Sequence, residues 1–313
     1  MSVPSIVLLF AGQGSQAVGM GRTLAERFSS AKALLDQADS ILDFSLSAVM
    51  FDGPEEELTR TSRCQPALYV HGMMCLAALR EQLGKELQIG AVAGLSLGEF
   101  TAHAAAGTFG FVEGLQLVAK RGRFMEEACE ATDGSMAAMI GGTVEQVREL
   151  ANSVGVDVAN LNSPGQVVVS GARDRIAAAI AGAKEAGIRI AKEIKVAGAY
   201  HSALMLSAQD KLAAELSQIS INTPNFPVLS NLTAEPAMDA EEIRRTLEAQ
   251  VTGSVRWSES IEKLLEDGQS HFLEGGPGKV LTGLMGRIRK GTFCMPTGEA
   301  EALNDAIVAL KAI

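Results

Sequence analysis

The sequence has few cysteines and few aromatic residues. Its four cysteines, Cys64, Cys75, Cys129 and Cys294, are widely spaced and include no CxxC pair. This spacing indicates neither a disulfide framework nor a zinc site, and it is typical of a protein in the reducing cytoplasm. Aromatic residues make up only 4% of the chain. The many alanines and glycines suit closely packed α/β layers better than a β-sandwich.

Long apolar segments are also missing. No apolar stretch approaches the ~20 residues that a membrane-spanning helix needs. The first apolar run, 6–10, is too short for a signal peptide and has no basic residue before it. We therefore expect a cytoplasmic protein with no membrane partner.

Positive charge is scarce, with 27 Lys and Arg against 37 Asp and Glu and a formal net charge of −10. This balance argues against nucleic acid or an anionic membrane as the main partner. Any anionic ligand must instead meet a local cluster of positive charge. The 313 residues suffice for one large domain that carries a smaller one, or for two domains.

A serine flanked by two glycines stands out in the segment Gly94-Leu95-Ser96-Leu97-Gly98. It follows the apolar run 89–93 and precedes an expected helix at 99–106, which is the nucleophile-elbow pattern. In such a turn the serine hydroxyl is exposed and the next backbone N–H points at a developing oxyanion. The alternative is an ordinary strand–helix turn with an incidental serine.

A second glycine-rich turn, 12–17 (GQGSQA), follows an expected strand at 5–11. It nearly fits the dinucleotide-binding fingerprint, which leaves an oxidoreductase as an alternative from another class. That fold needs a second strand ending in an acidic residue about 20 residues later. Residues 29–42 instead carry their apolar side chains at helical spacing, which disfavours it. The turn still offers free backbone N–H groups to an anion or oxyanion.

The middle of the chain changes character. We expect a strand at 136–141, a helix at 144–154, strands at 157–161 and 167–170 joined by 162–165, a helix at 174–186 and a strand at 188–196. This β-α-β-β-α-β order is the ferredoxin-like split motif, which closes on itself and is typical of an inserted unit. The expected division is a catalytic subdomain of 1–128 and 199–313, and a ferredoxin-like subdomain of 129–198.

A serine nucleophile needs a base, usually histidine. His103 lies seven residues after Ser96 on the same expected helix, roughly 10.5 Å along its axis, which is too far. His71 sits in an apolar helical stripe and His271 begins an apolar run. His201 lies where the inserted unit returns the chain, so it is the preferred base. No acidic residue stands out as the group that orients His201. A backbone carbonyl can also orient it, by accepting the Nδ1 hydrogen.

Arg121 lies on the expected helix 111–128, inside its apolar arc, whereas Lys120 and Arg123 lie on the polar face. A buried guanidinium demands a partner because unpaired burial is costly. The partner is either an internal carboxylate or a substrate carboxylate held by a bidentate fork. The second interpretation assumes that water surrounds the guanidinium when the site is empty.

These motifs resemble those of malonyl-CoA:acyl-carrier-protein transacylases and of the acyltransferase domains of polyketide and fatty-acid synthases. The resemblance covers essentially the whole chain. It implies an α/β-hydrolase-like core with a parallel sheet and an inserted ferredoxin-like (βαββαβ) subdomain. It rests on six blocks in order: 10–16 (FAGQGSQ), 94–99 (GLSLGE), 120–122 (KRG), 159–166 (ANLNSPGQ), 200–202 (YHS) and 274–281 (EGGPGKVL).

The resemblance implies a catalytic role for four residues. Ser96 would be the acylated nucleophile and His201 its base. The backbone N–H groups of Gln13 and Leu97 would form the oxyanion hole.

It also implies contacts to substrate. Arg121 would grip the free malonyl carboxylate, and Gln250, near it, would supply the carbonyl that orients His201. Asn162 would lie near the active serine, Gln166 near the pantetheine or coenzyme A, and Tyr200 at the border of the acyl pocket.

Three departures from the family pattern occur. Leu95 stands where many members have histidine, Tyr200 where phenylalanine or serine is common, and Gly253-Ser254 where a proline-containing pair is usual. The last departure puts the position of the Gln250 carbonyl in doubt.

The implied activity is transfer of a malonyl group from malonyl-CoA to the phosphopantetheine thiol of an acyl carrier protein, for fatty-acid or polyketide synthesis. It requires no metal or redox cofactor, and coenzyme A enters only as the thioester substrate. A thioester hydrolase on the same fold and a non-catalytic carrier-docking module are the alternatives. Because carrier proteins are acidic, docking needs a basic patch. The candidates are Arg189, Lys192 and Lys195, or Arg287, Arg289 and Lys290.

Overall fold

The computed structural model describes residues 3–313 as a mixed α/β protein with two sheets. The larger sheet has six strands in the order β10-β9-β1-β2-β7-β8. All neighbouring strands in it are parallel except β7 and β8. The strands are β1 (Ile6–Phe10), β2 (Ile89–Gly94), β7 (Val228–Leu229), β8 (Pro236–Ala237), β9 (His271–Gly275) and β10 (Phe293–Pro296).

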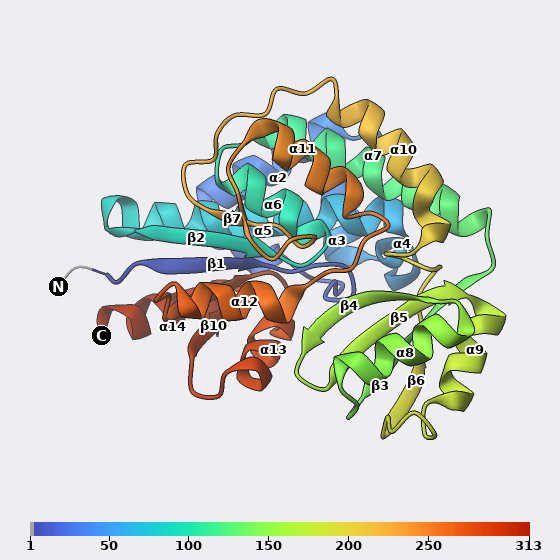
Figure 1. Ribbon diagram of the computed structural model, residues 1–313. Helices are drawn as coiled ribbons and strands as arrows, with labels where there is room; N and C mark the ends of the chain where they lie inside the picture. Colours follow the sequence, from blue (N-terminus) through green and yellow to red (C-terminus); the bar gives the residue numbers. More distant parts are fainter. Residues whose placement is uncertain (1–2) are drawn as a thin grey trace.

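The central strand β1 is buried on both faces, as a parallel sheet covered by helices requires. Its residues alternate between two apolar cores: Leu8 and Phe10 belong to the larger one, and Val7 and Leu9 to the smaller. The larger core includes α2 (Ser29–Ile41), α5 (Thr61–Leu83), α6 (Leu97–Ala105) and α7 (Phe111–Glu130). The smaller includes α12 (Trp257–Glu266) and α13 (Val280–Ile288), on the opposite face in Figure 1.

Further helices lie around the larger sheet. They are α1 (Arg22–Arg27), α3 (Leu46–Asp52), α4 (Glu55–Thr59), α10 (Leu206–Leu216), α11 (Ala240–Ala249) and α14 (Ala300–Lys311), with short 3₁₀ turns at Gly84–Glu86 and Ala203–Met205. The helix at 29–42 is present as α2, where a dinucleotide-binding fold would place its second strand. No helix within residues 3–313 is long and apolar enough to cross a membrane.

The smaller sheet is antiparallel, with the order β4-β5-β3-β6, and has its own apolar core. Its elements follow the expected β-α-β-β-α-β order: β3 (Gly134–Ile140), α8 (Val144–Val154), β4 (Asp157–Ser163), β5 (Gln166–Ala172), α9 (Arg173–Gly182) and β6 (Ile190–Ile194). This is the ferredoxin-like arrangement. We propose that the unit's boundaries lie at 129 and 198, because α7 ends at Glu130 and the separate core of the unit lies within these boundaries.

The hairpin of this unit is tighter than the sequence pattern predicts. Asn162 and Ser163 lie in β4, so only Pro164 and Gly165 form the turn, and Gly165 has the positive φ of 69° that such a turn needs. In Figure 1 the unit lies beyond the carboxyl end of β1. Ligands of open α/β sheets bind at this edge.

Candidate active site

Ser96 occupies a strained turn between β2 and α6, with φ 54° and ψ −106°. The flanking glycines are required by close packing. A Cβ on Gly94 would lie 1.9 Å from the carbonyl carbon of Gly98, and a Cβ on Gly98 would lie 2.1 Å from the carbonyl oxygen of Phe10. The geometry is that of a nucleophile elbow, with the serine at its tip and partly exposed.

His201 meets Ser96 across 105 residues of chain, with 2.8 Å between Ser96 Oγ and His201 Nε2. Its Nδ1 lies 2.9 Å from the backbone oxygen of Gln250, so this carbonyl accepts the Nδ1–H and leaves Nε2 free to accept the serine proton. Gly253-Ser254 therefore does not displace the carbonyl. Burial, with a contribution from the charge of Arg121, lowers the pKa of His201 to about 4, so the ring is a neutral base at neutral pH.

The other histidines lie elsewhere. His71 is buried beside the backbone oxygen of Gly298, and His103 is buried beside Thr108. His271, at the start of β9, packs against Phe293. Only His201 contacts the serine among these four.

Two backbone N–H groups lie in the turns at Ser96. Leu97 is the first residue of α6, so its N–H has no partner within the helix. The Gly12-Gln13 turn packs directly on the elbow, because a Cβ on Gly12 would lie 2.3 Å from the backbone oxygen of Leu95. This packing brings the Gln13 turn against the elbow at Ser96.

Arg121 is buried beside the nucleophile, with 1% of its surface exposed. Its guanidinium donates to Gln65 Oε1 at 2.8 Å, to Gln250 Oε1 at 2.9 Å and to Ser96 Oγ at 3.2 Å. Within the described chain it forms no ion pair with a carboxylate, and its Nε–H has no hydrogen-bond partner. Burial lowers the pKa of Arg121 to about 10, so it still carries its charge at neutral pH.

The assumption that water surrounds this guanidinium in the empty site is wrong. Two glutamine carbonyl oxygens replace the water, and the ring of Phe100 lies 5.0 Å from the guanidinium carbon. Neutral acceptors take up three N–H groups of Arg121 without cancelling its charge.

A buried carboxylate that the sequence analysis did not single out lies behind the elbow. Glu99 Oε2 accepts from Gln250 Nε2 at 2.5 Å and from the backbone N–H of Asn231 at 3.1 Å. Asn231 in turn accepts from the N–H of Ser96 and donates to the oxygen of Gly94, both at 2.7 Å. Burial raises the pKa of Glu99 to about 7. An acidic residue in a mostly apolar helix was the available signal for Glu99, whereas nothing in the sequence marks Asn231.

The comparisons with known proteins agree with this geometry. The family profile described as "Acyl transferase domain" matches residues 7–289. The malonyl CoA-acyl carrier protein transacylase of Bacillus subtilis is 39% identical over 98% of this chain and 97% of its own length. The chain belongs to the family of malonyl CoA-acyl carrier protein transacylases.

Two solved structures of this family show the same fold. The acyl-carrier-protein S-malonyltransferase from Bartonella henselae has a TM-score of 0.93 at 37% identity, covering 98% of this chain and 100% of its own. A malonyl-transacylase structure in complex with a type II polyketide-synthase acyl carrier protein also has a TM-score of 0.93, at 36% identity, covering 99% and 100%. The resemblance to the transacylases and the α/β fold class are thus confirmed.

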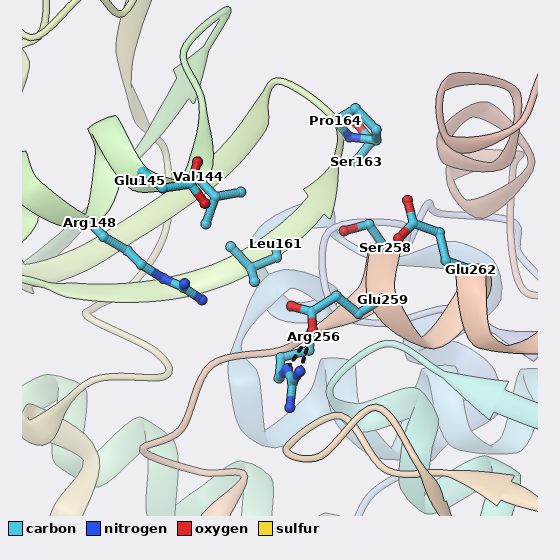
Figure 2. Close-up of a pocket in the computed structure, with 10 residues that line it drawn as sticks. All are labelled: Val144, Glu145, Arg148, Leu161, Ser163, Pro164, Arg256, Ser258, Glu259 and Glu262. Carbon is cyan, nitrogen blue, oxygen red and sulfur yellow. Dashed lines mark hydrogen bonds and ion pairs between the residues drawn. The ribbon is translucent and has the colours of Figure 1, made fainter.

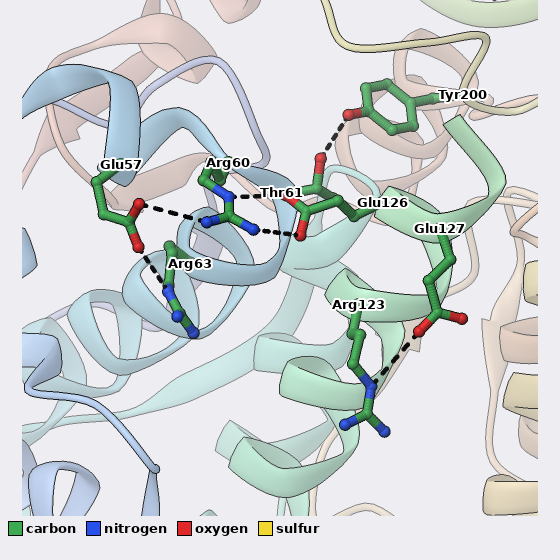
Figure 3. A network of polar contacts seen from close by, with 8 residues as sticks. All are labelled: Glu57, Arg60, Thr61, Arg63, Arg123, Glu126, Glu127 and Tyr200. Carbon is green, nitrogen blue, oxygen red and sulfur yellow. Dashed lines mark hydrogen bonds and ion pairs between the residues drawn. The ribbon is translucent and has the colours of Figure 1, made fainter. Parts of the chain in front are cut away.

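Tyr200, one of the departures from the family pattern, is 7% exposed and held by two hydrogen bonds. Its hydroxyl lies 2.6 Å from Thr61 Oγ1 and accepts from Gln13 Nε2 at 3.3 Å. Thr61 begins α5 beside Arg60, which forms an ion pair with Glu126 of α7 (Figure 3). The tyrosine therefore links the Gln13 turn to the start of α5.

Asn162 and Gln166 lie on the β4–β5 hairpin and form no hydrogen bond to Ser96, His201 or Arg121 in the part of the chain that the structure describes. Asn162 lies where the β4–β5 pairing shifts register, and its side-chain oxygen is buried without a partner. Gln166 instead accepts a hydrogen bond from Arg287 of α13. The hairpin thereby contacts the larger subdomain at α13.

A hollow of about 460 Å³ lies between α8, the end of β4 and the start of α12 (Figure 2). Leu161 and Ser163, on either side of Asn162, line it together with an Arg256–Glu259 ion pair. None of the residues around the nucleophile lines this hollow, so it is separate from the site at Ser96.

Proposed function

We propose that the chain transfers a malonyl group from malonyl-CoA to the phosphopantetheine thiol of an acyl carrier protein through an acyl-Ser96 intermediate. The observation that carries the proposal is Arg121. A buried cation lies 3.2 Å from the Ser96 hydroxyl and has only neutral partners. Such a cation is ready to bind the free carboxylate of a malonyl group when the thioester carbonyl faces the serine.

In the first half of the reaction, Ser96 Oγ loses its proton to His201 Nε2 and attacks the thioester carbonyl. The N–H groups of Gln13 and Leu97 stabilise the oxyanion. The C–S bond then breaks, and the coenzyme A sulfur takes the proton from His201. The Gln250 carbonyl keeps the imidazole in the tautomer that this transfer needs.

The second half runs the same steps in reverse. The carrier thiol gives its proton to His201 and attacks the acyl-Ser96 ester, and Ser96 leaves with the proton from His201. We assign Asn162 to the neighbourhood of the active serine, Gln166 to the neighbourhood of the pantetheine, and Tyr200 to the border of the acyl pocket. The reaction uses no metal or redox cofactor, and the malonyl carrier product would serve fatty-acid or polyketide synthesis in the cytoplasm.

Mass spectrometry of the intact protein tests this function. Mixing with malonyl-CoA is expected to add one malonyl group, which peptide mapping places on Ser96 and which a carrier protein with phosphopantetheine removes. Acetyl-CoA serves as the matched control and should label the protein far more slowly. Labelling at another residue would contradict the mechanism, and release of free malonate without loading of the carrier would indicate a hydrolase.

The acidic carrier requires a basic docking surface. Of the two candidate patches, the one on α13 is favoured because its Arg287 contacts Gln166, and Arg289 and Lys290 beside it are exposed. Reversing both charges (Arg289→Glu with Lys290→Glu) is expected to raise the KM for the carrier about tenfold, with less effect at high salt, and to leave malonylation by malonyl-CoA unchanged. The matched control reverses Lys192 and Lys195. If the KM for the carrier rises only when Lys192 and Lys195 are reversed, the docking surface lies at β6 instead.

A further inference from the structure

Glu99 lies in the first turn of α6, three residues after the nucleophile, and is fully buried. Its Oε2 accepts both the Gln250 side-chain N–H and the Asn231 backbone N–H. It has no contact with the Ser96 hydroxyl or with His201. A buried carboxylate is costly unless it is paired and hydrogen-bonded, and Glu99 Oε1 has no hydrogen-bond partner among the described residues.

The side chain of Gln250 connects this carboxylate to the site. Its Nε2 donates to Glu99 and, at 2.9 Å, to the backbone oxygen of Ser96, while its Oε1 accepts from Arg121. The reversed amide would place its NH₂ group against the guanidinium and its oxygen against two acceptors. Glu99 therefore fixes which end of the amide faces Arg121.

This arrangement also keeps Arg121 available. A carboxylate in direct contact with Arg121 would form a bidentate ion pair and occupy the guanidinium N–H groups that a substrate carboxylate needs. The amide of Gln250 separates the two charges, so the electrostatic attraction of Glu99 reaches Arg121 without blocking it. Burial lowers the pKa of Arg121, and the nearby negative charge of Glu99 raises it in opposition.

We propose that Glu99 is a positioning residue that acts through the Gln250 amide to hold Arg121 beside Ser96. The proposal rests on the proposed function, because Arg121 is the residue that a malonyl carboxylate would bind. Glu99 touches no substrate. Its influence on the reaction passes through one side chain, which a double-mutant cycle can isolate.

The experiment compares Glu99→Met, Gln250→Ala and the double variant. Methionine keeps the volume of Glu99 but removes the acceptor, and Gln250→Ala keeps the backbone carbonyl that orients His201. Each single variant is expected to slow Ser96 malonylation about 10- to 100-fold, the effect of losing a hydrogen bond to a charged group. When Gln250 is already alanine, adding Glu99→Met is expected to slow malonylation by less than about threefold further.

Glu99→Gln is the conservative variant, since its amide oxygen still accepts from Gln250. Glu99→Gln should retain most of the malonylation rate. Any small decrease that it causes should disappear when it is made in the Gln250→Ala background. Glu274→Gln is the matched control: Glu274 is another buried carboxylate, but it accepts from the backbone N–H groups of Leu281 and Thr282 at the start of α13. Its substitution should lower thermal stability without a change in the ratio of malonyl to acetyl labelling.

Additive effects of Glu99→Met and Gln250→Ala on the malonylation rate would overturn the proposal. A fluorophosphonate that labels Ser96 provides a second readout of the same cycle. Wild-type protein that reacts with the fluorophosphonate but not with malonyl-CoA would refute the proposed function, while the coupling between Glu99 and Gln250 would still be measured.

Discussion

Replacing Arg121 by alanine is expected to lower kcat/KM for malonyl-CoA by a factor of about 30 to several thousand, the effect of losing one partner of a buried charge pair. The substrate carboxylate would then face Phe100 and two glutamine side chains, which supply no positive charge. Acetyl-CoA has no carboxylate to lose, so its kcat/KM should hold or rise. Steady-state kinetics with both thioesters measure the two changes.

Two further variants sharpen this test. Arg121→Lys should rescue poorly, because an ammonium group cannot reach Gln65, Gln250 and a carboxylate with the geometry of a fork. Arg123→Ala is the matched control, since Arg123 lies on the same helix with 60% of its side chain exposed and only a 3.9 Å ion pair with Glu127. An equal loss for malonyl-CoA and acetyl-CoA in Arg121→Ala would make the arginine a structural residue.

Replacing His201 by alanine is expected to slow acylation of Ser96 by at least three orders of magnitude, because the serine proton then has no acceptor. The pH profile gives a more specific test. With a pKa of about 4, His201 stays neutral as the pH falls below 6.5. The decrease in wild-type kcat/KM that protonation of His201 causes should therefore occur near pH 4. Stopped-flow acylation across this range measures this decrease in the wild-type protein.

His271→Ala is the histidine control, as His271 lies at the start of β9 and contacts Phe293 rather than the serine. It should leave the rate and the pH profile unchanged. Retention of the wild-type profile in His201→Ala would reject His201 as the base.

The sequence was most informative where local geometry decides the structure. Gly94 and Gly98 can accept no side chain, so the elbow around Ser96 follows from the pentapeptide and the strand before it. The position of Arg121 follows from helical periodicity alone. The β-α-β-β-α-β order was likewise readable, because each of its elements has its own apolar pattern.

The contacts across the chain could not be predicted in this way. Glu99, Asn231 and Gln250 come from three separate segments, and their network depends on how α6, the turn after β7 and the end of α11 pack together. The neutral partners of Arg121 have the same origin. Asn162 was expected in a loop because Pro164-Gly165 marks a turn, but residue patterns locate the ends of strands only loosely.

The buried histidines also make folding depend on acidity. Burial lowers the pKa values of His71 and His201 to about 4 and that of His103 to about 3, from an ordinary 6.5. Below pH 6.5 the unfolded chain binds protons that the native chain excludes, so these groups remove stability as the pH falls towards 4. Glu99 acts in the opposite direction: its pKa of about 7, against 4.5, favours the native state at low pH and disfavours it as the pH rises to 7. Burial also raises the pKa of Glu274, which acts in the same direction as Glu99. The stability that the three neutral histidines contribute is therefore lost as the pH falls from 6.5 towards 4, whereas the two buried carboxyl groups oppose this loss.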